Sequence, residues 1–242
     1  MTAKELELKE DEIQNEIKTL AEKHNLITEN LLPIYDGIYS AEKYLSASLR
    51  LMWVLKEPYD DADENGSPCG GGWSIPKDLF KNPSDYAGGG LSAKMVTRLS
   101  YCLLNDKKFA ESQDLNSKPE IAEALQNIAY INISKMPAGT TTNDATLPEK
   151  YNIWKTILQK QIEIYSPDVI IFGNTFNYFA SDLFDGNYPE PNLKFGMAKG
   201  FCWNKSLLIS AYHPGFPKNE ETQDNYASEI IKVVNTWKSQ NK

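Results

Sequence analysis

The chain has 242 residues, of which 41% are hydrophobic and 24% are charged. This length and composition suffice for one sizeable core, and we expect one large α/β domain. The net charge of −8 argues against a protein that holds nucleic acid over a broad surface, because affinity for phosphates comes mainly from clustered lysine and arginine side chains. Only two arginines, Arg50 and Arg98, are present, which excludes phosphate or guanine recognition by several arginines. Any nucleic-acid footprint must therefore be small.

The sequence indicates neither a membrane protein nor a metal-binding scaffold. No run of about 18 apolar residues exists to span a bilayer. The stretch 1–20 is rich in Glu and Lys and lacks the apolar core of a signal peptide, so we expect a cytoplasmic protein. The cysteines Cys69, Cys102 and Cys202 are widely separated and form no CxxC pair, which gives no sign of a disulfide framework, an iron–sulfur cluster or a zinc site.

The first half of the chain predicts two helices, a strand, a long loop and a further helix. Apolar residues recur at helical spacing over 3–24, and Ser40 is a candidate N-cap for a short helix over 40–45. The apolar run 51–55 stops at a charged pair and a proline, which is typical of a buried parallel strand. Residues 60–90 are rich in Gly, Pro, Asp, Asn and Ser and are expected to form a functional or disordered loop before a helix over 94–104.

The second half alternates helices with apolar strands. We expect helices over 121–128, 148–165 and 224–237, strands over 129–133, 167–173 and 207–211, and a Gly/Thr-rich loop over 138–146. Alternation of this kind favours three layers, with helices on both faces of a central, mostly parallel, four-stranded sheet. We expect residues 1–45 to form a helical extension packed on an α/β domain that spans 46–242.

Polar residues follow these strands at the points where ligands bind in open parallel sheets, beyond the carboxyl ends of the strands. The first strand is followed by Glu57, Pro58 and Tyr59, and the fourth by Tyr212 and His213. The second strand carries Asn132 and leads to Lys135. Each residue alone has a structural role open to it as a cap, an ion-pair partner or a turn residue. Together, at strand ends, they predict one cleft with a carboxylate, an amide and an imidazole.

These segments, taken in order, resemble motifs of the uracil-DNA glycosylase superfamily. Residues 55–59 (LKEPY) are similar to its water-activating loop, 72–76 (GWSIP) to the segment with a base-stacking aromatic, and 131–133 (INI) to the strand with a base-reading Asn. Residues 167–173 (PDVIIFG) resemble a strand of the superfamily, and 211–215 (AYHPG) the loop that ends its fold. The resemblance runs from about residue 48 to the C-terminus. It implies a uracil-DNA glycosylase-like αβα domain.

The resemblance implies a role for each matched residue. Hydrolysis of an N-glycosidic bond builds positive charge on the sugar and negative charge on the base. Glu57 would stabilise the sugar cation and orient or deprotonate water, and His213 would donate a hydrogen bond to the departing base. Asn132 would read the edge of a flipped base. Substrate contacts are further expected from Pro58, Tyr59, Trp73, Lys135, Tyr212 and Phe216, with Trp73 stacking on the base, Tyr59 crowding a thymine methyl and Phe216 acting as a wedge.

The leading hypothesis is thus a DNA-repair glycosylase that excises uracil or another damaged base from single-stranded DNA, or from a duplex with a flipped base, without metal or cofactor. The sequence departs from the family pattern where Glu57 replaces Asp, Lys56 replaces Gln and Gly215 replaces Ser. Two alternatives stay open. One is a non-catalytic member that binds a nucleotide or nucleic acid. The other is an unrelated small-molecule α/β hydrolase, although the GxSxG, P-loop and GxGxxG motifs are absent from the sequence.

Overall fold

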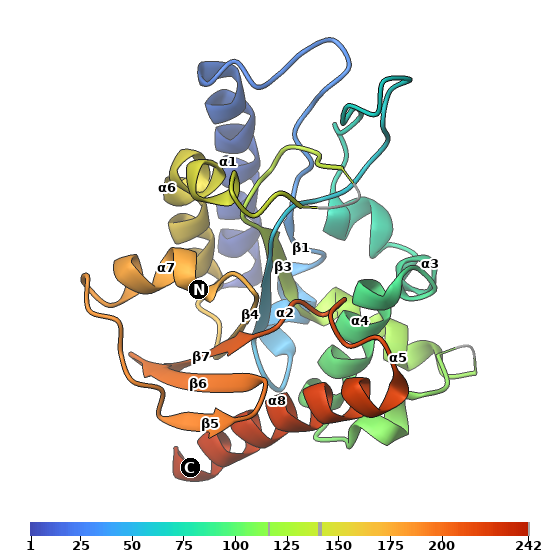
Figure 1. The fold of residues 1–242 in the computed structure, drawn as a ribbon, viewed down its shortest axis with the longest axis vertical. Helices are drawn as coiled ribbons and strands as arrows, with labels where there is room; N and C mark the ends of the chain where they lie inside the picture. Colours follow the sequence, from blue (N-terminus) through green and yellow to red (C-terminus); the bar gives the residue numbers. More distant parts are fainter. Residues whose placement is uncertain (116, 140–141, 242) are drawn as a thin grey trace.

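A mixed β-sheet forms the middle layer of the molecule in the computed structural model, which describes residues 1–115, 117–139 and 142–241 (Figure 1). Within these residues the sheet has seven strands in the order β1-β3-β2-β4-β7-β6-β5. Their bounds are β1 (Gly37–Ile38), β2 (Leu51–Leu55), β3 (Ala129–Asn132), β4 (Val169–Gly173), β5 (Leu193–Phe195), β6 (Ala198–Trp203) and β7 (Ser206–Ala211). The strands β3, β2, β4 and β7 run parallel, and β1, β6 and β5 pair antiparallel to their neighbours.

The four strands expected from sequence are these four parallel ones, and the mixed α/β class is confirmed. The expected number of strands is wrong, because β1, β5 and β6 widen the sheet at both edges. A physical reason explains in each case why the sequence pattern does not predict the strand. β1 has two residues, and β5 has no fully buried side chain. β6 carries Gly200 at its centre, which weakens its strand pattern.

Helices cover both faces of the sheet. Their bounds are α1 (Ala3–Lys23), α2 (Ala41–Ser46), α3 (Pro83–Ala87), α4 (Leu91–Leu104), α5 (Pro119–Glu123), α6 (Leu147–Tyr165), α7 (Phe176–Leu183) and α8 (Glu220–Gln240). A π-helical turn, η1, spans Ile75–Leu79, and two 3₁₀ turns, η2 and η3, span Phe109–Ser112 and Ala124–Asn127. The expected loop 60–90 therefore contains η1 and α3, and the expected helix 121–128 divides between α5 and η3. The helix α7 was not expected. Of the expected loop 138–146, Thr140 and Thr141 lie outside the described residues.

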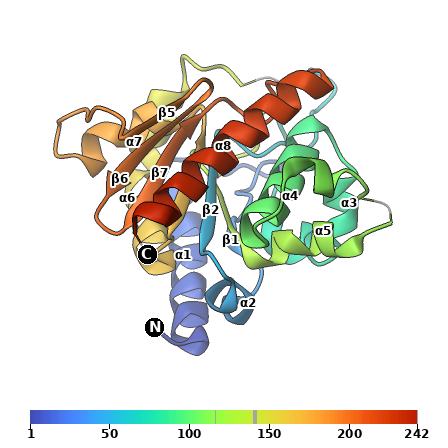
Figure 2. The same cartoon turned by 90° about the horizontal axis from the view of Figure 1, so that it is seen from below.

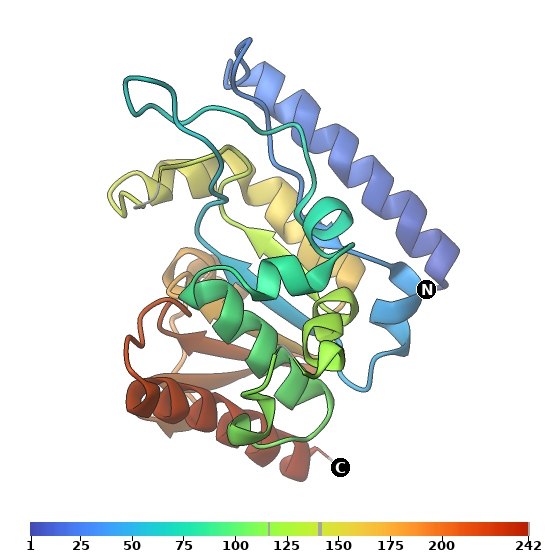
Figure 3. The same cartoon turned by 90° about the vertical axis from the view of Figure 1, so that its right-hand side faces the viewer.

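Alternate residues of the buried strands face opposite helical layers, as the two-residue period of a strand requires. Met52, Val54 and Phe172 pack with α1, α6 and α7 on one face. Trp53 and Ile171 pack with α4 and α8 on the other. Figure 2 shows α8 crossing beneath the sheet beside α4, and Figure 3 shows α1 along the opposite side. The three expected layers are present.

Helix α1 is part of the core on its face of the sheet. Its N-terminus is held by a capping box between Thr2 and Glu5, which satisfies two backbone N–H groups of the first turn. Leu6, Ile13 and Ile17 are buried in the same cluster as the strand residues of that face. None of the described helices combines the length and the apolar character that crossing a bilayer requires.

Candidate active site

The carboxyl ends of β2 and β7 converge above the end of β4, which lies between them in the sheet. Gly173 makes this convergence possible. A Cβ atom at Gly173 would lie 2.6 Å from Leu55 Cδ2 and 3.0 Å from Pro214 Cδ, so a larger residue would push the two loops apart. The loop that carries Glu57 and the loop that carries His213 consequently meet over a strand that ends without a side chain.

A cavity of about 550 Å³ lies at this edge of the sheet. Five of the residues expected from sequence line it, namely Glu57, Pro58, Tyr59, Trp73 and His213. Its other walls include the start of α4 and two aromatic side chains, Tyr86 and Tyr130, whose hydroxyls are hydrogen-bonded to each other at 3.2 Å. Four expected residues, Asn132, Lys135, Tyr212 and Phe216, do not line it. The cavity thus contains a carboxylate, an imidazole and aromatic surface.

Glu57 is an ion-pair partner as well as a lining residue. Its side chain is 2% exposed and its Oε1 atom pairs with the ammonium of Lys150, in the first turns of α6. The pair holds the carboxylate in one orientation, because a charged donor makes a stronger hydrogen bond than a neutral one. Lys150 was not expected from sequence. It lies 93 residues from Glu57 on an ordinary helix, and no spacing pattern links the two.

His213 is neutral at physiological pH. Burial lowers its pKa to about 4, and the nearby ammonium groups of Lys56 and Lys218 contribute to that lowering. Its Nδ1 atom accepts a hydrogen bond from the backbone N–H of Gly215 at 3.2 Å. A neutral imidazole that accepts at Nδ1 carries its proton on Nε2, so His213 offers a hydrogen-bond donor without a charge.

A rigid frame holds Trp73 in the cavity wall. The Oδ2 atom of Asp60 accepts hydrogen bonds from Trp73 Nε1 at 2.7 Å and from the backbone N–H of Gly71 at 2.6 Å. The residues just before Trp73, Gly70 to Gly72, have φ between +81° and +90°, a region that favours glycine. Gly70 and Gly72 hydrogen-bond to the backbone of residues 30–33. Asp60 lies within the loop predicted from sequence, but its partnership with Trp73 gave no sequence signal.

Asn132 is buried at the end of β3, with 1% of its surface exposed. Neither Oδ1 nor Nδ2 of its side chain has a hydrogen-bond partner among the described residues. It lies two residues after Tyr130, and alternation along the strand puts both side chains on one face of the sheet. Tyr130 and Leu55, the register partner of Asn132 on β2, both line the cavity. The unsatisfied amide therefore lies on the face of the sheet that forms the cavity floor.

Lys135 occupies a different place from the one its sequence position suggested. It is fully buried, and its Nζ atom contacts both carboxylate oxygens of Asp36 at 2.8 Å. It also donates to Gln161 Oε1 and to the backbone carbonyl of Asn132, each at 2.9 Å. These bonds use every donor of its ammonium group. Lys135 is therefore a partner of the backbone beneath the site rather than a cation in the cavity.

Tyr212 and Phe216 flank the His213 loop on the protein surface. They are 47% and 51% exposed, and their rings stack with centroids 4.5 Å apart and an interplanar angle of 19°. The loop between them is fixed by Tyr226, whose hydroxyl donates to the Tyr212 carbonyl at 2.8 Å. Tyr59, at 57% exposure, belongs to the same edge of the sheet. Exposed aromatic surface thus borders the cavity.

The charges around the cavity nearly balance. Lys56 pairs with Asp144, which is 61% exposed, and Lys150 pairs with Glu57. Lys218 also lines the cavity. In the described part of the chain, no three His, Cys, Asp or Glu side chains converge as ligands for a metal ion. The site offers three lysine ammonium groups beside two carboxylates rather than a broad basic surface.

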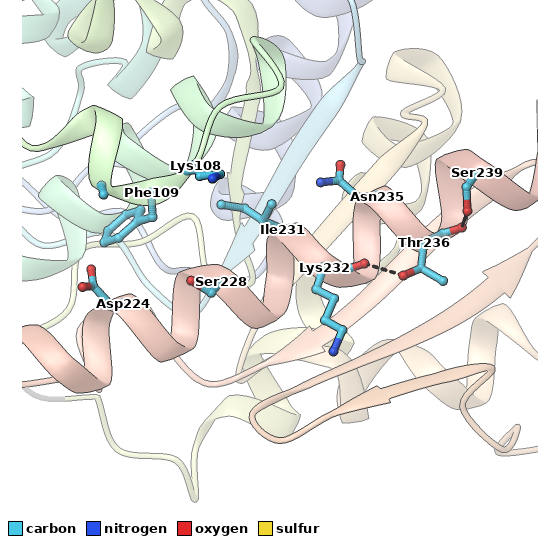
Figure 4. Close-up of a pocket in the computed structure, with 10 residues that line it drawn as sticks. Lys108, Phe109, Asp224, Ser228, Ile231, Lys232, Asn235, Thr236 and Ser239 are labelled. Atoms are coloured by element: carbon cyan, nitrogen blue, oxygen red, sulfur yellow. Dashed lines mark hydrogen bonds between the residues drawn. The ribbon is translucent and has the colours of Figure 1, made fainter.

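Another hollow, of about 610 Å³, lies along α8 and shares no lining residue with this cavity. Figure 4 shows its lining side chains, including Phe109 from η2 and Asp224, Ile231 and Lys232 from α8. The dashed contact at Thr236 is a bond from its hydroxyl to the Lys232 carbonyl within the helix, at 2.8 Å. Among the residues that the structure describes, no imidazole or buried carboxylate lines this hollow. The candidate catalytic groups therefore lie in the cavity at Glu57 and His213.

Comparison with known proteins gives no family to add to this geometry. No protein-family model matches the chain, and no curated protein matches it with significant sequence similarity.

Proposed function

We propose that the protein is a base-excising glycosylase that hydrolyses the N-glycosidic bond of uracil or another damaged base in DNA. The observation that carries the proposal is the joint presence of Glu57 and a neutral, Nε2-protonated His213 in one cavity at the carboxyl edge of the sheet. The parallel order β3-β2-β4-β7, with the two residues on the loops after β2 and β7, is consistent with the resemblance to uracil-DNA glycosylases.

The two groups suit the two charges that develop when the glycosidic bond breaks. The bonding electrons leave with the base, and the sugar carbon becomes cationic. Glu57 stabilises the cation and orients a water molecule, whose oxygen bonds to the sugar carbon while its proton passes to the carboxylate. His213 donates a hydrogen bond from its Nε2–H group to a carbonyl oxygen of the departing base. A neutral imidazole serves this role without protonating the base.

The remaining residues account for recognition of a base removed from its stack. Trp73, fixed by Asp60, supplies a stacking face, and Tyr59 narrows the cavity. A uracil edge presents one donor and one acceptor together, which a single carboxamide matches. The unpartnered Asn132 amide does not line the cavity but lies on the sheet face that carries the lining residues Leu55 and Tyr130. We propose that it supplies this pair when a base enters, because a buried amide without partners costs free energy until a ligand satisfies it.

The test is release of uracil from a single-stranded oligonucleotide at low salt, where the few cations near the cavity act most strongly. We expect release by the unaltered protein and a loss of about 10²-fold or more in rate for His213→Ala, since it removes a donor at the developing anion. Glu57→Gln is expected to abolish release. Glu16→Gln is the matched control, because Glu16 also pairs with a lysine, Lys160, but on the outer surface of α1. Absence of release from both single-stranded and duplex substrates would overturn the proposal.

A second candidate is a non-catalytic protein that binds a nucleotide in the same cavity. The Lys150–Glu57 ion pair favours it, because the carboxylate that would face the sugar already has a cationic partner. Binding of deoxyuridine monophosphate without release of uracil, retained in Glu57→Gln, would support this candidate. Lys150→Met separates the two functions. It should alter the rate and its pH dependence in a glycosylase, but only the affinity in a binding protein.

A further inference from the structure

The backbone of Asn132 is held by a buried ion pair at a point where the sheet provides no neighbouring strand. Strand β1 pairs Gly37 with Tyr130 and Ile38 with Ala129 and goes no further. On the other side of β3, the N–H of Ile133 donates to the Leu55 carbonyl of β2 at 2.9 Å. Successive residues of a strand direct their backbone groups to opposite sides, so those of Asn132 point to the side where β1 is missing.

The side chains of Asp36 and Lys135 hydrogen-bond to the backbone of Asn132 at this gap. The Asp36 Oδ2 atom accepts the N–H of Asn132 at 2.7 Å, and Lys135 Nζ donates to its carbonyl at 2.9 Å. One acidic and one basic side chain thus satisfy both backbone groups that a strand partner would otherwise satisfy. Gln161 of α6 braces the pair through a bond to each member, at 2.8 and 2.9 Å.

The attraction between the two charges does not by itself account for an ion pair at this position. Asp36 is 1% exposed and Lys135 is fully buried, so both charges have lost their hydration. Apolar residues of similar volume often replace such pairs without loss of stability. An apolar pair would fill the space but would leave the N–H and carbonyl of Asn132 without partners. The property that only the polar pair supplies is a fixed backbone at Asn132.

We propose that the Asp36–Lys135 ion pair is a positioning device for the Asn132 amide, and so sets the base specificity of the site. Its role in specificity rests on the proposed glycosylase function, whereas its role in holding Asn132 does not. Asp36 and Lys135 touch no reacting atom and act through Asn132. The two charges hold the strand end rigid, and the side chain on that strand end keeps its donor and acceptor aimed at one edge of the base.

The decisive variant is Asp36→Leu/Lys135→Met, which replaces the pair by apolar side chains of similar size. Hydrogen exchange of the Asn132 backbone N–H is the first readout. We expect exchange to accelerate by about tenfold or more, as loss of a buried hydrogen bond implies, while the N–H of Ile170 in β4 stays as protected as before. Glu10→Gln is the matched control, because Glu10 is equally buried nearby but bonds to Ile38, Gln14 and Tyr165 rather than to Asn132. Unchanged exchange at Asn132 in the double variant would overturn the proposal.

A cycle of variants provides the second readout. Removing the ion pair should lower kcat/KM for uracil release by about tenfold in the unaltered background and cause no further loss when Asn132→Ala is already present. Equal losses in both backgrounds would indicate a merely structural role and contradict the proposal. If the double variant fails to fold, Gln161→Met loosens the pair without touching Asn132 and should accelerate exchange at Asn132 more than at Ile170. If the unaltered protein releases no base, the proposed function fails, and the exchange measurement still decides whether the pair holds Asn132.

Discussion

Gly71 lies directly against the backbone carbonyl of Leu32, so that a Cβ atom at residue 71 would stand 1.9 Å from that oxygen. The contact joins the segment before Trp73 to the chain that leads into the sheet. Because the obstacle is backbone rather than a flexible side chain, no rotamer change relieves it.

Gly71→Ala should therefore destabilise the protein in two ways, through the positive φ that an alanine would adopt and through the clash of its Cβ atom with the Leu32 carbonyl. Gly66 provides the control, since its φ of +79° matches the +84° of Gly71 and a Cβ atom there meets nothing within 4 Å. We expect Gly66→Ala to lower the free energy of unfolding by about 1–2 kcal/mol, and Gly71→Ala to lower it clearly further. Urea unfolding of the two variants checks this. Equal losses would contradict the rigid frame around Trp73.

Asp60→Ala should loosen the indole of Trp73. The substitution leaves two donors, Trp73 Nε1 and the Gly71 N–H, without their acceptor, and we expect a loss of about 1–3 kcal/mol in unfolding free energy. Uracil release should slow because the stacking face is no longer fixed. Asp78→Ala serves as the control, since Asp78 accepts one backbone bond, from Ser74, at the start of η1. It should lose stability but keep its rate at saturating substrate.

His213 should make the folded state less stable as the pH falls. Its pKa is about 4 in the folded protein and near 6.5 when unfolded, so between these values the unfolded chain binds a proton that the folded chain does not. The contribution to stability is complete above pH 6.5 and declines by about 3 kcal/mol as the pH falls to 4. This contribution is measured as the difference in unfolding free energy between the unaltered protein and His213→Asn over the same pH range. An imidazole that titrates near pH 6.5 by NMR would contradict the lowered pKa of His213.

Glu10 should make the folded state less stable as the pH rises, which is the opposite of the effect of His213. Burial raises its pKa to about 7 from the ordinary value of 4.5, so between these values the folded protein holds a proton that the unfolded chain has lost. Its contribution is complete below pH 4.5 and declines by about 3 kcal/mol as the pH rises through 7. Glu10→Gln removes this titration and should gain stability relative to the unaltered protein as the pH rises from 4.5 to 8. A difference that stays constant with pH would contradict the assignment.

Patterns local in the sequence predicted the parts of this fold that depend on local physics. The buried strand 51–55 and the N-cap at Ser40 are examples, since an uninterrupted apolar run favours a buried strand and a serine hydroxyl favours the start of a helix. The hairpin of β5 and β6 was not predicted because β5 is an edge strand without a fully buried side chain and β6 carries Gly200 within it. In the site, strand-end positions were sufficient to find Glu57 and His213. Lys150, Asp60 and the contacts of Lys135 required the folded chain, because each partnership depends on the tertiary path rather than on spacing.

The place of α1 in the core has a consequence for how the chain folds during synthesis. Its apolar residues and the buried Glu10 meet partners on α6, among them Tyr165, which lies 155 residues later. At a synthesis rate of roughly 5–20 residues per second, α1 waits on the order of ten seconds for the helix that covers it. During that interval its apolar stripe is open to chaperones or to other nascent chains. Contacts this distant in sequence also favour slow folding. A substitution that weakens α1 should therefore reduce the yield of folded protein more than it reduces the stability of the molecules that do fold.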